Sequence, residues 1–315
     1  MNLMKHRKWY YLVSIILVTL GSLALIFWGL KPSIDFMGGS KMELRGTTDT
    51  AKVTEFLKEN GVNGAVAQKI GDEGLTVRFG EINEEKHRKI SAGIRAALGE
   101  GVSEVGFETV GPTISKELTR NAFIAIALAS LVIIIYIGYS FRRVPKPANS
   151  WEFGMAAIIA LAHDTIIVVG SFALLGRLNN VEVDPLFITG LLTVIGFSVH
   201  DTIVIFDRIR ENLIKKGASE FEAIVNESLL EMLPRTLNTS YLVWVILLIL
   251  FAFGGTTIKY FVLTLVIGIF VGTFSSLLVA SPLLITWQEF KKLERKKIKL
   301  PKIKISKKST PKKKN

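Results

Sequence analysis

The sequence predicts a membrane protein, an all-α bundle of six transmembrane helices with one α+β domain between helices 1 and 2. Three observations lead to this fold class. Of the 315 residues, 49% are hydrophobic, which is more than a soluble chain of this length needs to bury one core. Six apolar runs are long enough to cross a bilayer. One long polar stretch, residues 31–120, combines mixed charge with short strand and helix patterns.

The positive charge of the chain is concentrated near its C-terminal end. Residues 291–315 contain thirteen Lys or Arg and one Glu, so this segment alone accounts for the formal net charge of +12. The remainder is neutral, and the basic balance therefore does not indicate a nucleic-acid-binding surface. The chain has no cysteine, which excludes disulfides, thiol catalysis and thiolate metal sites.

The N-terminal segment predicts the first span and its direction. Residues 9–30 supply about twenty apolar residues, enough to cross the hydrocarbon core. Lys5, Arg7 and Lys8 precede them and place the N-terminus in the cytoplasm by the positive-inside rule. A cleaved signal peptide is the alternative, but its hydrophobic region is normally shorter and ends at an Ala-x-Ala site.

Residues 31–120 predict an extracytoplasmic domain. They carry thirteen Lys or Arg and fourteen Asp or Glu, which is typical of a soluble domain, and a domain of this length can be translocated regardless of its charge. The apolar and turn residues give the order β-α-β-β-α-β, the ferredoxin-like or split βαβ pattern. The six predicted elements are strand 41–45, helix 49–60, strands 65–70 and 75–79, helix 83–98 and strand 102–110.

Local signals support the two helices of this domain. Thr48 or Asp49 can cap the first helix, and Gly61 ends it. A turn at residues 71–74 joins the two central strands. The helix side chains expected in the core are Val53, Phe56, Leu57, Ile90, Ile94, Ala97 and Leu98.

Five further spans follow the domain, and an amphipathic cytoplasmic stretch, residues 207–234, separates the fourth from the fifth. These spans are predicted at 122–139, 151–175, 186–206, 237–253 and 260–287. The chain therefore divides into 1–30, the cytoplasmic N-terminus with helix 1; 31–120, the outer domain; 121–288, helices 2–6; and 289–315, a basic cytoplasmic tail.

Two features near the C-terminal end predict contacts. In the sixth span, Gly268 and Gly272 form a GxxxG motif that Ser276 continues, so we expect a neighbouring helix to pack closely there. The basic tail is expected to be disordered or to lie on anionic lipid headgroups. A contact with the ribosome or with an acidic partner is the alternative for the tail.

Ionisable residues interrupt three of the spans. The tripeptide His-Asp-Thr occurs in the third span with Asp164 and in the fourth with Asp201, and Arg235 begins the motif RTLNTS of the fifth. A carboxylate inside hydrocarbon costs roughly 2.5–3.5 kcal/mol on insertion scales, so such residues face protein or water. Asp201 and Arg235 share the cytoplasmic half of the bilayer. We predict that they form an ion pair which protonation of Asp201 releases.

Each of these residues has a structural alternative. A buried Asp201–Arg235 pair could lock the bundle, Asp164 could be held by neighbouring hydroxyls, and helix packing is the favoured role for His163 and His200. The repeated His-Asp dipeptide also suggests a metal-dependent phosphohydrolase. The four histidines of the chain do not supply the further ligands that such a site needs, so we predict no metal site.

Motifs along nearly the whole chain resemble the SecF family of bacterial protein-export subunits. IDFMGGS at 34–40, which contains Asp35, Gly38 and Gly39, is similar to the family motif that follows the first helix. Further matches are VGP at 110–112 with SKEL at 115–118, AHD at 162–164, SVHDTIV at 198–204, FDRIREN at 206–212 and RTLNTS at 235–240. Without a second set of six spans, the chain resembles the separate subunit and not the fused SecDF form.

The resemblance implies a non-enzymatic translocation motor, without a cofactor, in the bacterial inner or plasma membrane. Such a subunit pairs with SecD in a twelve-span unit of the resistance-nodulation-division type. It uses the proton gradient to pull exported polypeptide outward from the SecYEG channel, with YajC as a further partner. The implied relay residues are Asp201, its partner Arg235, Asp164 and His200, where many relatives carry Asn; Thr202, Asn238 and Thr239 are polar supports.

Two other functions fit parts of the pattern. A passive scaffold that stabilises SecD and the channel would need no proton relay. Half of a small-molecule exporter would need an apolar cleft in the outer domain and a matching second half in the same chain. The acids within the spans favour the proton-driven subunit.

Overall fold

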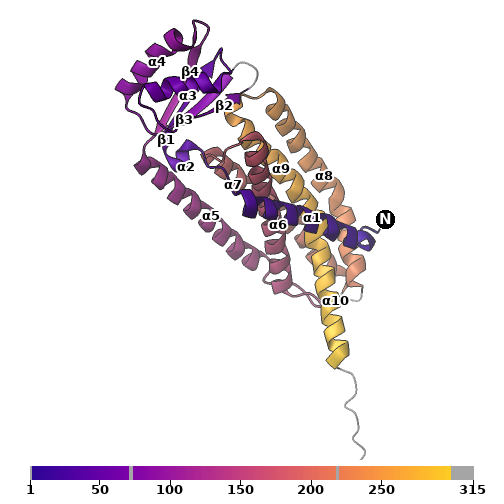
Figure 1. The fold of residues 1–315 in the computed structure, drawn as a ribbon. Coiled ribbons are helices and arrows are strands. Elements are labelled where there is room, and N and C mark those ends of the chain that lie inside the picture. Colours follow the sequence, from indigo (N-terminus) through magenta and orange to yellow (C-terminus); the bar gives the residue numbers. More distant parts are fainter. Residues whose placement is uncertain (1, 71–73, 218–219, 299–315) are drawn as a thin grey trace, which may run out of the picture.

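The computed structural model describes residues 2–70, 74–217 and 220–298, and shows a bundle of long helices with a small α+β domain at one end (Figure 1). Within these residues, six helical stretches are long and apolar enough to cross a membrane. Their bounds are Met4–Trp28, Pro112–Ser140, Ser150–Asn179, Pro185–Lys216, Phe221–Phe253 and Lys259–Leu293. The predicted number of spans is therefore confirmed.

These stretches contain the following elements. A short 3₁₀ turn, η1 (Met4–His6), leads into α1 (Arg7–Trp28), and the next four spans are α5 (Pro112–Ser140), α6 (Ser150–Asn179), α7 (Pro185–Lys216) and α8 (Phe221–Phe253). After η2 (Thr256–Ile258), the last span consists of α9 (Lys259–Ser275), a π-helical turn, η3 (Ser276–Ala280), and α10 (Ser281–Ile298). We call the end of the bundle beside the domain the domain end, and the opposite one the far end.

The helices extend beyond the predicted spans at the far end. Of the predicted stretch 207–234, residues 207–216 and 221–234 are helical as expected, but they do not form a separate element, because α7 continues to Lys216 and α8 runs from Phe221 through Pro234 without interruption. The helix that contains the sixth span likewise continues to Ile298. The predicted tail 289–315 is therefore helical at its start, and its residues from 299 onward lie outside the described part of the chain.

The domain between α1 and α5 contains a four-stranded sheet with two helices. In chain order its elements are β1 (Gly39–Arg45), α3 (Thr50–Glu59), β2 (Val66–Ile70), β3 (Gly74–Phe79), α4 (Glu84–Leu98) and β4 (Ser103–Val110). The strands pair in the order β2-β3-β1-β4, and all three pairings are antiparallel. The predicted sequence of elements is thus observed, whereas the turn predicted at 71–74 lies largely outside the described residues.

Helix caps and a small apolar core account for the domain. The side chain of Asp49 accepts a hydrogen bond from the Lys52 N–H at the start of α3, and Asn83 does the same for α4. The core lies between the two helices and one face of the sheet, and its members include Met42, Val53, Leu57, Leu75, Val77, Ile90 and Ile94. Ala97 is exposed, contrary to the prediction, whereas Leu98 packs against this core and is partly buried.

Glycines allow the closest helix contacts of the bundle. A Cβ added to Gly170 on α6 would lie 2.3 Å from the Cα of Gly21 on α1. On α9, a Cβ added to Gly268 would lie 2.1 Å from Val194 of α7. Close packing at the GxxxG motif is therefore confirmed, and α7 is the neighbour. In contrast, α5 lies at the edge of the bundle and is almost entirely exposed (Figure 1).

Backbone and side-chain contacts join the domain to the domain end of the bundle. Pro32 forms a parallel β-bridge with Val183 in the loop between α6 and α7. In this bridge the Ser33 N–H donates to the Val183 carbonyl at 2.9 Å, and the Val183 N–H donates to the Lys31 carbonyl at 2.8 Å. A one-turn helix, α2 (Ile34–Met37), follows and packs on α5. The domain is thus held by the bundle at more than its two chain connections.

Candidate functional site

A buried carboxylate on α6 lies at the centre of a polar cluster inside the bundle. Asp164 is only 1% exposed. Its Oδ1 lies 2.8 Å from Nδ1 of His163, and its Oδ2 accepts hydrogen bonds from the hydroxyls of Ser198 on α7 and, at 2.7 Å, Ser275 on α9. We call these four residues the Asp164 cluster. Three separate membrane helices therefore meet at one carboxyl group, and hydrogen bonds replace the water that the group loses on burial.

A second set of hydroxyls lies next to this cluster. Thr202 on α7 and Ser276 on α9–α10 are joined through their side-chain oxygens at 2.8 Å. Ser276 also donates to the backbone carbonyl of Ser198 at 3.3 Å, so the two sets share one turn of α7. Further along α9, Thr273 donates to Ser240 of α8 at 2.8 Å. Polar contacts thus link α6, α7 and the last span, and a separate pair links α9 to α8, within otherwise apolar spans.

Asp201 is also buried in the bundle, but it lacks such contacts. Its side chain is 7% exposed, and among the described residues its Oδ2 has no hydrogen-bond partner. It follows Ser198 by three residues on α7 and is adjacent to Thr202. A charge at this position would therefore have little compensation, in contrast to the charge of Asp164.

The predicted ion pair between Asp201 and Arg235 is not present in the described structure. Arg208 pairs with Glu231 at 2.6 Å across the α7–α8 interface, and this contact sets the register of the two antiparallel helices. Asp201 precedes Arg208 by seven residues on α7, and Asn238 follows Glu231 by seven residues on α8. In antiparallel helices this register puts Asp201 at the level of Asn238. Arg235 is therefore about one helical turn, roughly 5 Å, farther toward the far end. The pair is not formed in this arrangement because sharing one half of the bilayer does not place two side chains at one level, and the switchable pair stays a prediction.

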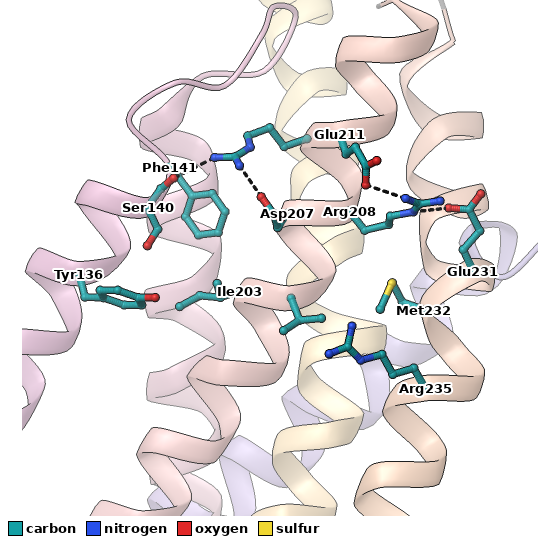
Figure 2. Close-up of a pocket in the computed structure, with 12 residues that line it drawn as sticks. Tyr136, Ser140, Phe141, Ile203, Asp207, Arg208, Glu211, Glu231, Met232 and Arg235 are labelled. Atoms are coloured by element: carbon teal, nitrogen blue, oxygen red, sulfur yellow. Dashed lines mark hydrogen bonds and ion pairs between the residues drawn. The ribbon is translucent and has the colours of Figure 1, made fainter.

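Arg235 instead lines a pocket of about 670 Å³ between α5, α7 and α8 (Figure 2). Figure 2 shows its guanidinium pointing from α8 toward α7, beside Met232. The other charges of the pocket are paired: Arg208 with Glu211 and Glu231, both at 2.6 Å, and Arg210 with Asp207 at 2.5 Å. Arg235 has no such partner in the part of the chain that the structure describes. It is a positive charge available to an acid that approaches it.

The remaining predicted polar residues divide between the interior and the outside of the bundle. Thr202 is buried in the hydroxyl series described above. His200, Asn238 and Thr239 are exposed on the outer surface of α7 and α8. The structure therefore does not bring His200 into the Asp164 cluster.

The motif residues Asp35, Gly38 and Gly39 lie at the domain end, away from these acids. The Ser33 hydroxyl donates to Asp35 at 2.9 Å at the start of α2. Gly38 and Gly39 have φ angles of +76° and +119°, which favour glycine, and they turn the chain from α2 into β1. The motif therefore shapes the connection between span and domain.

Sequence reasoning missed Ser275, which is fully buried and contacts Asp164 directly. A serine within an apolar span usually indicates close helix packing, so its type alone did not single it out. The sequence signal that could have identified Ser275 is the run of two serines after the GxxxG motif. Two adjacent hydroxyls in one span can supply hydrogen bonds to an acid such as Asp164 in another. No group of three or more His, Asp or Glu that could hold a metal ion occurs among the residues described.

Comparisons with known proteins agree on one family. The family described as "Protein export membrane protein SecD/SecF, C-terminal" matches residues 92–290. The chain is 42% identical to protein translocase subunit SecF of Thermobaculum terrenum over 301 residues, which cover 91% of this chain and 94% of that protein. It is 36% identical to the SecF subunit of Anaerolinea thermophila, with 91% and 94% covered.

Among solved structures, the chain is similar to SecDF of Thermus thermophilus, a translocon-associated membrane protein. The TM-score is 0.79 at 32% sequence identity, with 92% of this chain and 39% of that longer chain covered. A second SecDF structure, in a super-membrane-facing form, has a TM-score of 0.67 at 31% identity and covers 95% of this chain and 40% of that one.

Proposed function

Because the chain belongs to the SecF family of protein translocase subunits, we propose that it uses the proton gradient, together with SecD, to drive the export of polypeptides. On this proposal it is a transport subunit without catalysis of its own. The observation that carries the proposal is the pair of acids buried in neighbouring spans, Asp164 with full hydrogen bonding and Asp201 with an unpartnered oxygen. An ionisable residue inside the membrane is a candidate functional residue by default, and proton relays are among the uses of such residues.

Asp201 is the proton-carrying group in this proposal. Its environment offers no counter-ion, so its neutral form is the one that suits the described arrangement. Loss of the proton would create a charge that requires a positive partner. Arg235 carries an unpaired charge about one turn away, and a shift of α8 along α7 by roughly 5 Å would bring the two together. The two protonation states would thus favour different positions of the helices.

The domain is the part that such a helix movement would reorient. We propose that it is ferredoxin-like and extracytoplasmic; its antiparallel strand order β2-β3-β1-β4, with one helix between β1 and β2 and one between β3 and β4, supports the first point. Lys5, Arg7 and Lys8 at the far end support a cytoplasmic N-terminus and hence the second point. The proposed membrane is the bacterial inner or plasma membrane.

The proposed partners follow from the family. A SecD subunit would pack on this bundle, and the SecYEG channel, YajC and the exported polypeptide would contact the assembly. The exposed polar residues His200, Asn238 and Thr239, which lipid alone would satisfy poorly, support a protein partner on the outer surface of α7 and α8. Anionic lipid is the proposed partner of the basic tail.

The proposal is tested by reconstituting the chain with SecD and the channel in proteoliposomes and measuring export with and without an imposed proton gradient. Asp201→Asn should abolish the gradient-dependent part of export while the protein still co-purifies with SecD. Glu85→Gln, an exposed change on α4, serves as the control. Gradient-dependent export at the wild-type rate by the Asp201→Asn protein would overturn the proton role.

A passive scaffold is the second candidate, and the absence of an Asp201–Arg235 pair from the described structure favours it. A scaffold requires only that the helices pack and that the partner binds. In that case Asp201→Asn and Arg235→Met would both be silent in the same assay. Substitution of the tightly packed Gly268 would instead disrupt co-purification with SecD.

A further inference from the structure

The last membrane helix is interrupted by a single π-helical turn, η3, beside the Asp164 cluster. Its cause is in the sequence. Pro282 has no N–H to donate to the carbonyl of Leu278, four residues earlier, and its ring clashes with that carbonyl in a regular α-helix. Widening the helix to a π turn removes the clash. The Ser281 hydroxyl donates to the Ser276 carbonyl at 3.2 Å and so gives this turn an additional hydrogen bond.

The π turn begins where two consecutive serines contact two different helices. Ser275 donates to Asp164 on α6 at 2.7 Å, and Ser276 bonds Thr202 on α7 at 2.8 Å. Both serines are fully buried. Adjacent residues of a helix point about 100° apart, so they can contact both neighbours only while the helix keeps one particular rotation. The π turn starts at the second of these serines, Ser276, so a change of its winding would alter that rotation.

Beyond the π turn, α10 is attached to the far end of the bundle. Gln288 donates to Glu152 of α6 at 2.5 Å, and Lys291 forms an ion pair with the same carboxylate. Glu289 pairs with Arg7 at the start of α1 at 2.6 Å. One helix therefore connects the Asp164 cluster, through the π turn, with contacts to α6 and α1 at the far end.

We propose that Ser275 and Ser276 are positioning residues for the proton relay, and that the π turn set by Pro282 passes a change at Asp164 to α10. With Asp164 ionised, its carboxylate accepts from Ser275 and holds α9 in the described rotation. A proton on Oδ2 of Asp164 makes that oxygen a donor, so the Ser198 and Ser275 hydroxyls can no longer both donate to it as described, and the hold on α9 weakens. A π turn and a regular α turn are two discrete windings, as a switch requires. This inference rests on the proposed function.

The groups around Asp164 limit what else could act on it. His163, on its own helix, is the titratable side chain in contact with it. Three elements pack against α6 at this level, α1, α7 and α9. Residues 12–28 of α1 include no titratable side chain, and the described contacts of α7 and α9 to Asp164 are the hydroxyls of Ser198 and Ser275. Asp201 and His200 are the titratable residues of the same part of α7. A change of charge at Asp164 therefore acts on the neighbouring helices mainly through its hydrogen bonds with serine hydroxyls.

The first test compares two substitutions of the same shape. Ser275→Thr keeps the hydroxyl and Ser275→Val lacks it, while both add the same volume to the buried site. In the proteoliposome assay with SecD and the channel, we expect the Thr protein to export within about threefold of wild type and the Val protein to lose at least tenfold of the gradient-dependent rate. Thr264→Val is the matched control, because among the described residues the Thr264 hydroxyl bonds only its own helix, at the Tyr260 carbonyl.

The second test changes the π turn and leaves the serines in place. Pro282→Ala allows a regular helix and should lower gradient-dependent export at least tenfold. Pro185→Ala, at the first turn of α7 where no helical hydrogen bond is missing, is the control. If the Ser275→Val protein fails to assemble with SecD, the comparison of Pro282→Ala with Pro185→Ala still tests the inference. Equal export by the Thr and Val proteins, or wild-type export by Pro282→Ala, would overturn the inference.

Asp164→Asn separates this inference from the proposed function. Asp164→Asn and Asp201→Asn could both abolish gradient-dependent export while the Ser275 and Pro282 variants match their controls. That result would support the proposed proton relay and contradict the role of the π turn. If both Asn variants export normally, the proposed proton relay itself fails.

Discussion

Arg78 on strand β3 and Glu182 in the loop between α6 and α7 form an ion pair that ties the domain to the bundle. Their side chains are only 18% and 21% exposed. Burial lowers the pKa of Arg78 from its usual value, because removal from water disfavours the charged guanidinium. Glu182 therefore matters as a counter-ion, and the pair lies next to the β-bridge between Pro32 and Val183.

Removal of either charge should loosen the domain. We expect Arg78→Gln and Glu182→Gln each to speed amide hydrogen exchange at Ser33 and Val183, and the double variant to show a coupling of about 1–3 kcal/mol. Lys89→Gln breaks a largely exposed pair on α4 and should leave both amides unchanged. If exchange at the bridge does not respond to Arg78→Gln, the pair is not what holds the domain.

Asp184 predicts a pH dependence at the same junction. Its side chain caps α7 by accepting from the Phe187 N–H at 2.7 Å. Burial raises the pKa of Asp184; the hydrogen bond from Phe187 opposes this shift, and nearby Asp35 adds to it. A carboxyl group with a higher pKa in the folded state binds more protons there, so its contribution to stability falls as the pH rises through that pKa.

Asp184→Asn should remove this dependence and keep the cap, since Asn is as good an N-cap as Asp. In detergent micelles, the Tm of the variant should exceed that of the wild type at pH 7, and the difference should shrink as the pH falls toward 4. Asp49→Asn, at the exposed cap of α3, provides the control. A difference in Tm that stays constant with pH would contradict the assignment.

Gly39 should be intolerant of any side chain. Its φ is +119°, and an added Cβ would lie 2.7 Å from the carbonyl oxygen of Phe79. Gly39→Ala should therefore destabilise the domain by roughly 1–3 kcal/mol through backbone strain and this clash. Protease resistance of the domain in the intact protein measures the loss. Gly80→Ala, which has open space around the new Cβ, should behave as wild type; equal resistance of both variants would show that the backbone adjusts freely.

The spans could be predicted from the sequence because hydrocarbon thickness sets a minimum apolar length, and the domain because its caps and alternation are local signals. Whether Asp201 and Arg235 contact each other could not be predicted from the sequence. Hydropathy gives the depth of a residue to within a turn or so, whereas an ion pair needs the correct level and the correct rotation, which depend on packing with neighbouring helices. Contacts such as Arg208–Glu231 set that level only after the helices have met.

The Asp164 cluster shows that the sequence can identify a buried acid without identifying its partners. Asp164 was recognisable because an acid in an apolar run is costly. Its partners Ser198 and Ser275 come from helices that are distant in sequence. Placing a hydroxyl in a membrane span costs little free energy, so a serine there does not by itself indicate a functional role. Pro282 predicts a local disturbance of the last helix, but the form that it takes, a π turn beside two serines, depends on what those serines can bind.

Packing of Gly268 against Val194 should control the geometry of this cluster, because Val194 lies one turn before Ser198 on α7. A Cβ at position 268 would overlap the Val194 side chain, so Gly268→Ala must separate α9 from α7 or shift a side chain, at a cost of about 1–3 kcal/mol. Separation would also stretch the contacts that Ser275 and Ser276 make. We therefore expect a lower Tm in micelles together with a several-fold loss of gradient-dependent export.

A compensating change distinguishes this clash from a general intolerance of the site. Val194→Ala removes the two methyl groups nearest to a new Cβ at position 268 and leaves only the Cβ of residue 194, at 2.8 Å, so the double variant should recover part of the Tm that Gly268→Ala alone loses. Gly196→Ala, on the exposed side of α7 with open space around the new Cβ, controls for alanine substitution in this bundle. A double variant less stable than either single variant would mean that the two residues do not meet as described, because independent losses would then simply accumulate.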